Sequence, residues 1–68
     1  MKAYVMIKIR TGEVKDVVEN LRKIKGVKEA HMTFGPYDAV AEVETADVAT
    51  LGKVTALEIQ PIPGVEQT

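Results

Sequence analysis

Few side chains in this sequence can carry chemistry, and His31 is the most distinctive of them. The chain has one histidine, no cysteine and no serine. A serine or cysteine nucleophile needs a base beside it, so a catalytic triad is excluded. Glu29 and Thr33 share the face of His31 on a predicted strand, but a metal site there would need further ligands from elsewhere. We therefore predict no cofactor and interpret His31 as a residue of a sheet face or an interface.

Two carboxylates, Glu42 and Glu44, alternate on one face of another predicted strand. Paired carboxylates act as acid and base only where a partner assigns them different roles. The sequence offers no such partner, so we interpret them as part of a solvated sheet face.

The segment from Phe34 to Asp38 gathers a flexible glycine, a rigid proline, an amphipathic ring and a carboxylate in one short turn. Asp38 can accept hydrogen bonds from the amides of the turn, which is a structural role. It can also present its carboxylate to the ammonium group of a ligand. The residues favour the structural role slightly and leave both open, so the turn is a candidate site.

Alternation and helical spacing predict the elements that position these side chains. Residues 2–10 alternate as a strand, and Tyr4 and Met6 lie in the middle of its otherwise polar face. A subunit partner that covers this face would explain them. The remaining predictions are a helix with apolar positions from Val14 to Ile24 that stops at Gly26, strands over 27–34 and 39–45, a helix from an Asp47 cap to Pro61, and a strand over 65–68.

The sequence around Gly26-Val27 returns at Gly64-Val65. Each pair follows a predicted helix and precedes a predicted strand. Two such units in tandem predict an α+β fold, a ferredoxin-like βαββαβ antiparallel sheet with two helices on one face. The last strand is short, so we expect the neighbouring edge of the first strand to be partly unpaired.

Gly52 is the one glycine that no cap or turn explains. It lies in the middle of the predicted second helix, where glycine costs about 1 kcal/mol relative to alanine. Close approach of another backbone is the reason we consider for it.

The length and the net charge of the chain limit the number of domains and the classes of function that it can have. The chain of 68 residues is predicted to form a single domain, residues 1–68, and self-association is expected because so small a core stabilises a monomer weakly. Nine Lys and Arg against ten Asp and Glu leave a net charge of −1, without the basic excess of a protein that binds nucleic acid directly. Short, interrupted apolar stretches predict no membrane contact and a cytoplasmic location.

Three motifs follow one another along the chain: Gly26-Val27 after the first helix, Gly35-Pro36-Tyr37-Asp38 between the central strands, and Ile62-Pro63-Gly64-Val65 before the last strand. Together they resemble the ligand-sensing domain, or RAM domain, of the leucine-responsive regulatory protein/AsnC family. The resemblance spans essentially the whole chain. Members of that family usually carry an N-terminal helix-turn-helix domain, which this sequence lacks, so it resembles a stand-alone member.

The resemblance implies an assembly. Sheets of two subunits would pack face to face through Tyr4 and Met6, and such dimers would join into a ring-like oligomer. A small effector, commonly an amino acid, would bind between dimers near the central turn.

The resemblance also implies the site residues, which are Gly35, Tyr37, Asp38 and Thr68. Gly35 would permit close backbone approach, and Tyr37 would form a wall of the pocket. Asp38 would receive an amino group or fix the turn. Thr68 matches a threonine at the start of the family's last strand, which continues further in the family than it does here.

Three functions remain for such a chain. The first is an amino-acid-binding and oligomerisation module that modulates transcription through full-length family members. The second is an adaptor that needs no effector and captures another chain at an open sheet edge. The third and least favoured is a small dimeric α+β barrel enzyme with His31 as general acid and base. Because no second catalytic group is placed convincingly, we predict that the chain is not an enzyme.

Overall fold

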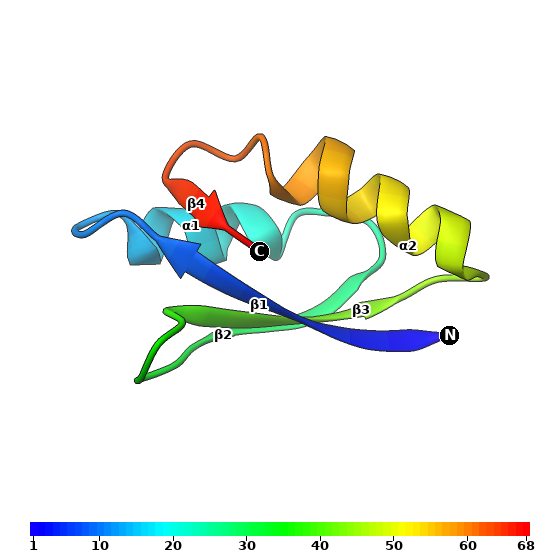
Figure 1. Cartoon of the computed structure of the whole chain (residues 1–68), viewed down its shortest axis with the longest axis horizontal. Coiled ribbons are helices and arrows are strands. Elements are labelled where there is room, and N and C mark those ends of the chain that lie inside the picture. The colour runs from blue at the N-terminus through cyan, green and yellow to red at the C-terminus, as the bar shows by residue number, and fades with distance from the viewer.

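Two helices cover one face of a four-stranded antiparallel sheet (Figure 1). The computed structural model describes residues 1–68. Along the chain the elements are β1 (Lys2–Ile9), α1 (Val14–Leu21), β2 (Val27–Met32), β3 (Ala39–Glu44), α2 (Val48–Val54), its π-helical continuation η1 (Thr55–Ile59) and β4 (Val65–Gln67). The strands lie in the order β2-β3-β1-β4. The predicted ferredoxin-like βαββαβ fold is confirmed.

The core lies between the inner face of the sheet and the two helices. Alternate residues of β1 and β3 point inward, and Ile7 and Val43 are fully buried there. The buried apolar side chains form one cluster, which consists of Ile7, Ile9, Val17, Val18, Leu21, Ala30, Ala39, Ala41, Val43, Val54 and Ile59. Because side chains alternate along a strand, the residues between these positions face away from the helices.

Two matching turns, Ile24–Val27 and Ile62–Val65, begin strands β2 and β4. In each turn the amide of the fourth residue donates to the carbonyl oxygen of the first at 3.1 Å. The third residues, Gly26 and Gly64, have φ angles of +101° and +100°. A positive φ at this position is the pattern of a type II turn, which favours glycine. The repeat in the sequence is therefore also a repeat of backbone geometry.

The strands end slightly earlier than predicted. β1 ends before Arg10, β2 before Thr33, β3 before Thr45 and β4 before Thr68. Backbone pairing nevertheless continues past some of these ends, since the amide of Arg10 donates to the carbonyl oxygen of Gly64 at 2.7 Å. Alternation in the sequence does not mark the residue at which regular pairing stops.

Both helices differ from the prediction at their C-terminal ends. α1 ends at Leu21, not at Gly26, because the following amides of Lys23 and Ile24 bond to carbonyls three residues back and tighten the chain. The predicted second helix changes to π-helical hydrogen bonding at Thr55. The predicted cap is confirmed, since Asp47 Oδ1 accepts from the amide of Thr50 at 2.8 Å.

The two edges of the sheet are treated differently. Arg22 covers part of the free edge of β2, because its Nε and Nη2 donate to the carbonyl oxygen of Ala30 at 3.0 and 2.8 Å. A carbonyl engaged in this way is not available to another strand. At the other edge β4 pairs with β1 only at Lys8 and Ile9. The partly unpaired edge expected beside the first strand is confirmed, and residues 2–7 of β1 pair with β3 alone.

Gly52 is exposed in α2, and no atom lies within 4 Å of the position that a β carbon would take. Within the chain, the close backbone approach considered for Gly52 is therefore absent. We predict that Gly52→Ala raises the free energy of unfolding by about 1 kcal/mol, because alanine has the higher helix propensity. Urea unfolding followed by circular dichroism measures the change.

Gly64→Ala is the matched control for this substitution. At Gly64 the φ angle is +100°, and a β carbon would lie 3.0 Å from Cγ2 of Val17. We expect this variant to lose stability because both the backbone and the packing oppose the added methyl group. A loss of stability in Gly52→Ala would contradict the assignment of Gly52 as an unconstrained helix position.

Candidate functional site

The turn between β2 and β3 is held against β1 by Asp38. Its Oδ2 accepts a hydrogen bond from the amide of Ile9 at 2.8 Å, and its own amide donates to the carbonyl oxygen of Ile7 at 2.9 Å. The expected structural role of Asp38 is therefore present, but the donor is an amide of β1 and not an amide of the turn. Oδ1, the other carboxylate oxygen, has no hydrogen-bond partner in the chain.

Gly35 and Tyr37 shape the tip of this turn. Gly35 has a φ angle of +127° with nothing within 4 Å of a β carbon, so the backbone conformation and not a close approach within the chain explains the glycine. The hydroxyl of Thr33 donates to the carbonyl oxygen of Tyr37 at 2.9 Å and ties the two sides of the turn together. Tyr37 keeps 38% of its surface exposed. The turn thus carries a partly exposed aromatic ring and a half-buried carboxylate.

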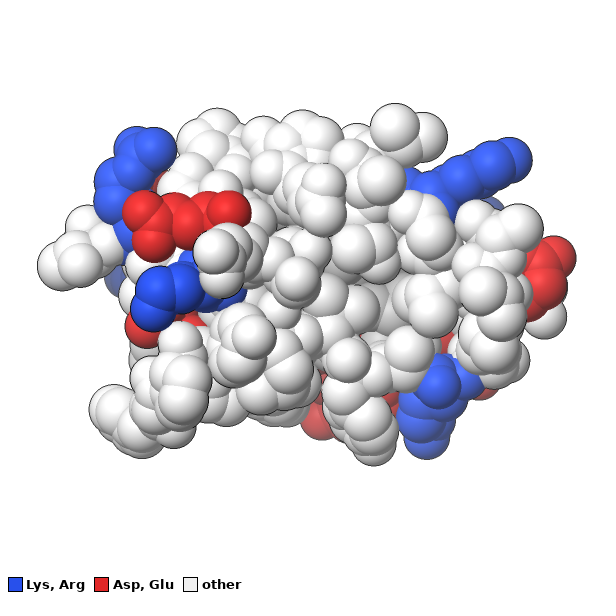
Figure 2. Space-filling model, in the orientation of Figure 1, with Lys and Arg blue, Asp and Glu red and all other residues white.

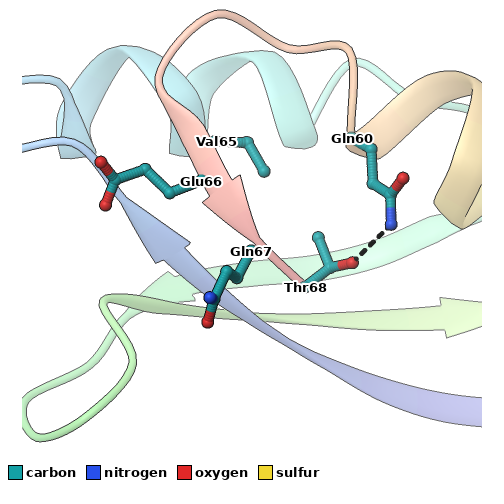
Figure 3. A pocket seen from close by; sticks show the side chains of 5 residues that line it. All are labelled: Gln60, Val65, Glu66, Gln67 and Thr68. Atoms are coloured by element: carbon teal, nitrogen blue, oxygen red, sulfur yellow. Dashed lines mark hydrogen bonds between the residues drawn. The ribbon is translucent and has the colours of Figure 1, made fainter.

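Thr68 lies in a separate hollow beside β4, with a volume of about 480 Å³ (Figure 3). Nε2 of Gln60 donates to Oγ1 of Thr68 at 3.0 Å across this hollow. β3, which follows the turn, and β4 flank β1 on opposite sides. One chain therefore does not bring Thr68 and the turn residues into a single pocket. The hollow is lined by Gln60, Val65, Glu66, Gln67 and Thr68.

The face of the sheet that the helices leave uncovered is named the outer face. It carries Tyr4 and Met6, which are 66% and 40% exposed. In the register of the sheet Tyr4 lies opposite Glu42, and Met6 lies opposite Val40. His31 follows on the far side of Val40. The outer face therefore has an apolar centre with charged side chains around it.

One ion pair and one hydrogen-bonded His–Glu pair lie on this outer face. Nζ of Lys2 lies 3.2 Å from Oε1 of Glu42, and their hydrogen bond raises the pKa of Lys2. Nε2 of His31 lies 3.1 Å from Oε1 of Glu29, and this hydrogen bond lowers the pKa of Glu29. Glu42 was expected to be solvated, but Lys2 pairs with it and its side chain is only 16% exposed. No group of three or more His, Cys, Asp or Glu side chains is placed to hold a metal ion.

The distribution of charge on the surface is mixed. In Figure 2 blue and red side chains lie near the ends of the visible face, and the middle of that face is uncharged. This face has no continuous basic surface of the kind that binds nucleic-acid phosphates. None of the helices is both long enough and apolar enough to span a bilayer.

Comparison with known sequences gives consistent results. A family model described as the Lrp/AsnC ligand binding domain matches residues 2–68. The HTH-type transcriptional regulator FL11 of Pyrococcus horikoshii is 35% identical over 68 residues, which is 100% of this chain and 44% of FL11. The chain thus spans less than half the length of that regulator.

Comparison with solved structures gives the same fold. The crystal structure of TTHA0845 from Thermus thermophilus matches with a TM-score of 0.92 and 35% identity, and the match covers 97% of this chain and 82% of that one. The structure of E. coli AsnC matches with a TM-score of 0.89 and 21% identity, over 97% of this chain and 45% of that one. The second likeness concerns the fold alone.

The role of Asp38 can be tested through stability. We predict that Asp38→Ala lowers the free energy of unfolding by about 1–2 kcal/mol, because it leaves the amide of Ile9 without its acceptor. Asp38→Asn keeps an oxygen that can accept this bond, so it should retain most of the stability. Urea unfolding of both variants makes the comparison. Equal losses in the two variants would contradict the role of the carboxylate as a hydrogen-bond acceptor.

Proposed function

The chain belongs to the Lrp/AsnC ligand-binding domain family, and on this basis we propose that it is an effector-binding and oligomerisation module that modulates transcription through full-length family members. The observation that carries the proposal is the match of the family model over residues 2–68. Relatives of the chain are named transcriptional regulators, including a proline dehydrogenase transcriptional activator of Rhizobium radiobacter. They support a regulatory ligand-binding domain and not an enzyme.

The partner of this module would be a longer regulator. The relatives are described as HTH-type, whereas the residues of this chain form one sheet domain with two helices. We propose that residues 1–68 act in the cytoplasm as the effector-binding domain, and that the contact with DNA is made by the helix-turn-helix of a full-length family member. The net charge of −1 supports the assignment of DNA contact to the longer regulator and not to this domain.

The effector would be an amino acid bound between subunits. Asp38 has one carboxylate oxygen fixed by Ile9 and one free, so a ligand ammonium group would meet an acceptor that is already oriented. The turn with Gly35 and Tyr37 and the hollow with Thr68 lie apart in one chain. A pocket between subunits would unite them by placing the turn of one chain against the hollow of another.

An amino-acid panel tests the effector. We predict that at least one of the common L-amino acids raises the melting temperature of the protein, because a ligand that binds only the folded state stabilises it. Asp38→Asn should abolish the shift while keeping the fold, because it removes the charge that attracts the ammonium group.

The control variant for this test is Glu58→Gln, which removes an exposed carboxylate from η1, beside Gly26 and Glu44 at the ends of β2 and β3 opposite the turn. It should respond to the panel like the wild-type protein. A flat response of the wild-type protein to every amino acid would refute the proposed effector, and so would an unchanged response in Asp38→Asn.

The assembly would begin with a dimer formed through the outer face. Tyr4 and Met6 lie in the centre of this face, and both keep a large exposed surface in the single chain. A second copy would remove that apolar surface from water, which is favourable by about 25 cal/mol per Å². A symmetric dimer uses the same patch on both copies. Such dimers would then join into the ring-like oligomer expected of the family.

Substitution of the two central residues tests this interface. We predict that Tyr4→Ser combined with Met6→Ser shifts the protein from dimer to monomer in sedimentation velocity, because the apolar centre is lost. Leu57→Ser is the control, since Leu57 is 70% exposed on η1, an element of the helix layer. A double variant that sediments like the wild-type dimer would rule out the outer face as the interface.

One observation favours the adaptor as a second candidate. Residues 2–7 of β1 pair with a strand on one side only, and such an edge can receive an extended segment of another protein. The enzyme alternative has no comparable support. His31 is exposed on the outer face, and its polar partner is Glu29.

A further inference from the structure

Three charged side chains and His31 form a diagonal line across the outer face, and we call this line the charge string. Lys2 on β1 pairs with Glu42 on β3 at 3.2 Å. Glu29 on β2 lies directly across from Glu42 in the register of the sheet. His31, two residues further along β2, pairs with Glu29 at 3.1 Å. With His31 protonated, the string has a positive group at each end and two negative groups in the middle.

Each of the two carboxylates in the middle of the charge string pairs with the residue at one end, Glu42 with Lys2 and Glu29 with His31. Like charges directly opposite each other on neighbouring strands are destabilising. The hydrogen bond with Glu42 raises the pKa of Lys2, and the hydrogen bond with His31 lowers the pKa of Glu29. Glu44, which lies opposite Lys2, adds a further negative charge at that end.

Covering the outer face changes the energetics of these charges. Exposed ion pairs contribute little in water, and the side chain of Lys2 is still 55% exposed in the single chain. A second copy that covers the face would remove water from the string, and every charge left without an opposite partner would then be costly. The string therefore restricts how a second copy can be placed.

The position of a two-fold axis determines which charges of the string meet across the interface. In a two-fold dimer one face meets the same face of the other copy. If the axis crosses the middle of the string, Glu42 and Glu29 of one copy meet the same two carboxylates of the other. If the axis crosses between Lys2 and Glu42, each lysine meets the glutamate of the second copy. The first arrangement is repulsive, and the second is attractive at both contacts.

The positions of Tyr4 and Met6 indicate which end of the charge string lies near the two-fold axis. Tyr4 lies directly opposite Glu42 and two residues from Lys2, and Met6 follows on the same strand. The other end, with Glu29 and His31, lies on the edge strand β2. An axis near Lys2 and Glu42 therefore brings the apolar centre and the attractive charges into contact together.

We propose that the outer-face dimer is arranged with its two-fold axis between Lys2 and Glu42, so that each residue pairs with its opposite on the second copy. The charges at positions 2 and 42 then determine which variants of the chain can form a dimer with each other. The inference rests on the proposed outer-face dimer and goes beyond it by naming the arrangement and the pair that selects the partner.

Charge reversal of each residue separately tests the inference. A dimer of Lys2→Glu has two Glu–Glu contacts across the axis, and a dimer of Glu42→Lys has two Lys–Lys contacts. We expect each variant to dimerise at least about tenfold more weakly than the wild-type protein, because like charges opposed in an interface cost several kcal/mol. Analytical ultracentrifugation over a concentration series measures the dissociation constants.

An equimolar mixture of the two variants gives the decisive result. In the mixed dimer the glutamate at position 2 meets the lysine at position 42 of the other chain, and the second contact is also attractive. We expect the mixture to form a heterodimer, identified by native mass spectrometry with one chain isotopically labelled. Rescue of this kind also shows that both variants are folded, since a misfolded chain is not repaired by the opposite charge on another chain.

Lys8→Glu is the matched control, because Lys8 lies on the same strand and face but outside the string. It should dimerise like the wild-type protein. Reversed variants that dimerise normally, or a mixture without heterodimer, would overturn the arrangement while leaving the outer-face dimer in place. A wild-type protein that is monomeric at every concentration would instead refute the outer-face dimer itself, and the arrangement with it.

Discussion

The alignment of the sheet depends on the two glycine turns. Gly26 and Gly64 each take a φ angle near +100°, which directs the chain from a helix into a strand. Their carbonyl oxygens accept the amides of Glu44 and Arg10 at 2.8 and 2.7 Å, so each turn is fixed to the end of a neighbouring strand. Once the register is fixed, every second side chain has to face the helices and the others the outer face. The core and the outer surface are two results of one alignment.

This dependence explains which parts of the fold the sequence could predict. The Gly-Val repeat and the alternation around Tyr4 and Met6 are local patterns, and they predict the topology and the two faces of the sheet. The π-helical end of α2 is not a local pattern. There the hydroxyl of Thr55 donates to the carbonyl oxygen of Leu51 at 3.0 Å. A threonine in a predicted helix does not indicate from the sequence alone that its hydroxyl makes this bond.

The candidate site, too, could be predicted only in part from the sequence. The composition of the turn indicated a site at Tyr37 and Asp38, but the donor to Asp38 is Ile9, 29 residues away in the chain. Nothing in the sequence connects these two residues before the register of β1 on β3 is known. The pairing of Lys2 with Glu42 depends on the same register. Sequence patterns therefore identify residue types near a site, and the sheet decides which of them meet.

A domain that binds its effector between subunits makes sensing and assembly one equilibrium. In the proposed assembly, a ligand held by the turn of one chain and the Thr68 hollow of another would bind the assembled state and not the separate subunits. By mass action the free energy by which it would stabilise the assembly rises with the logarithm of its concentration, once that concentration exceeds the dissociation constant. Asp38 suits this role because Ile9 fixes one carboxylate oxygen and leaves the other free. In the proposed pocket the acceptor would already be oriented when a subunit arrives, so little ordering of the turn would oppose binding.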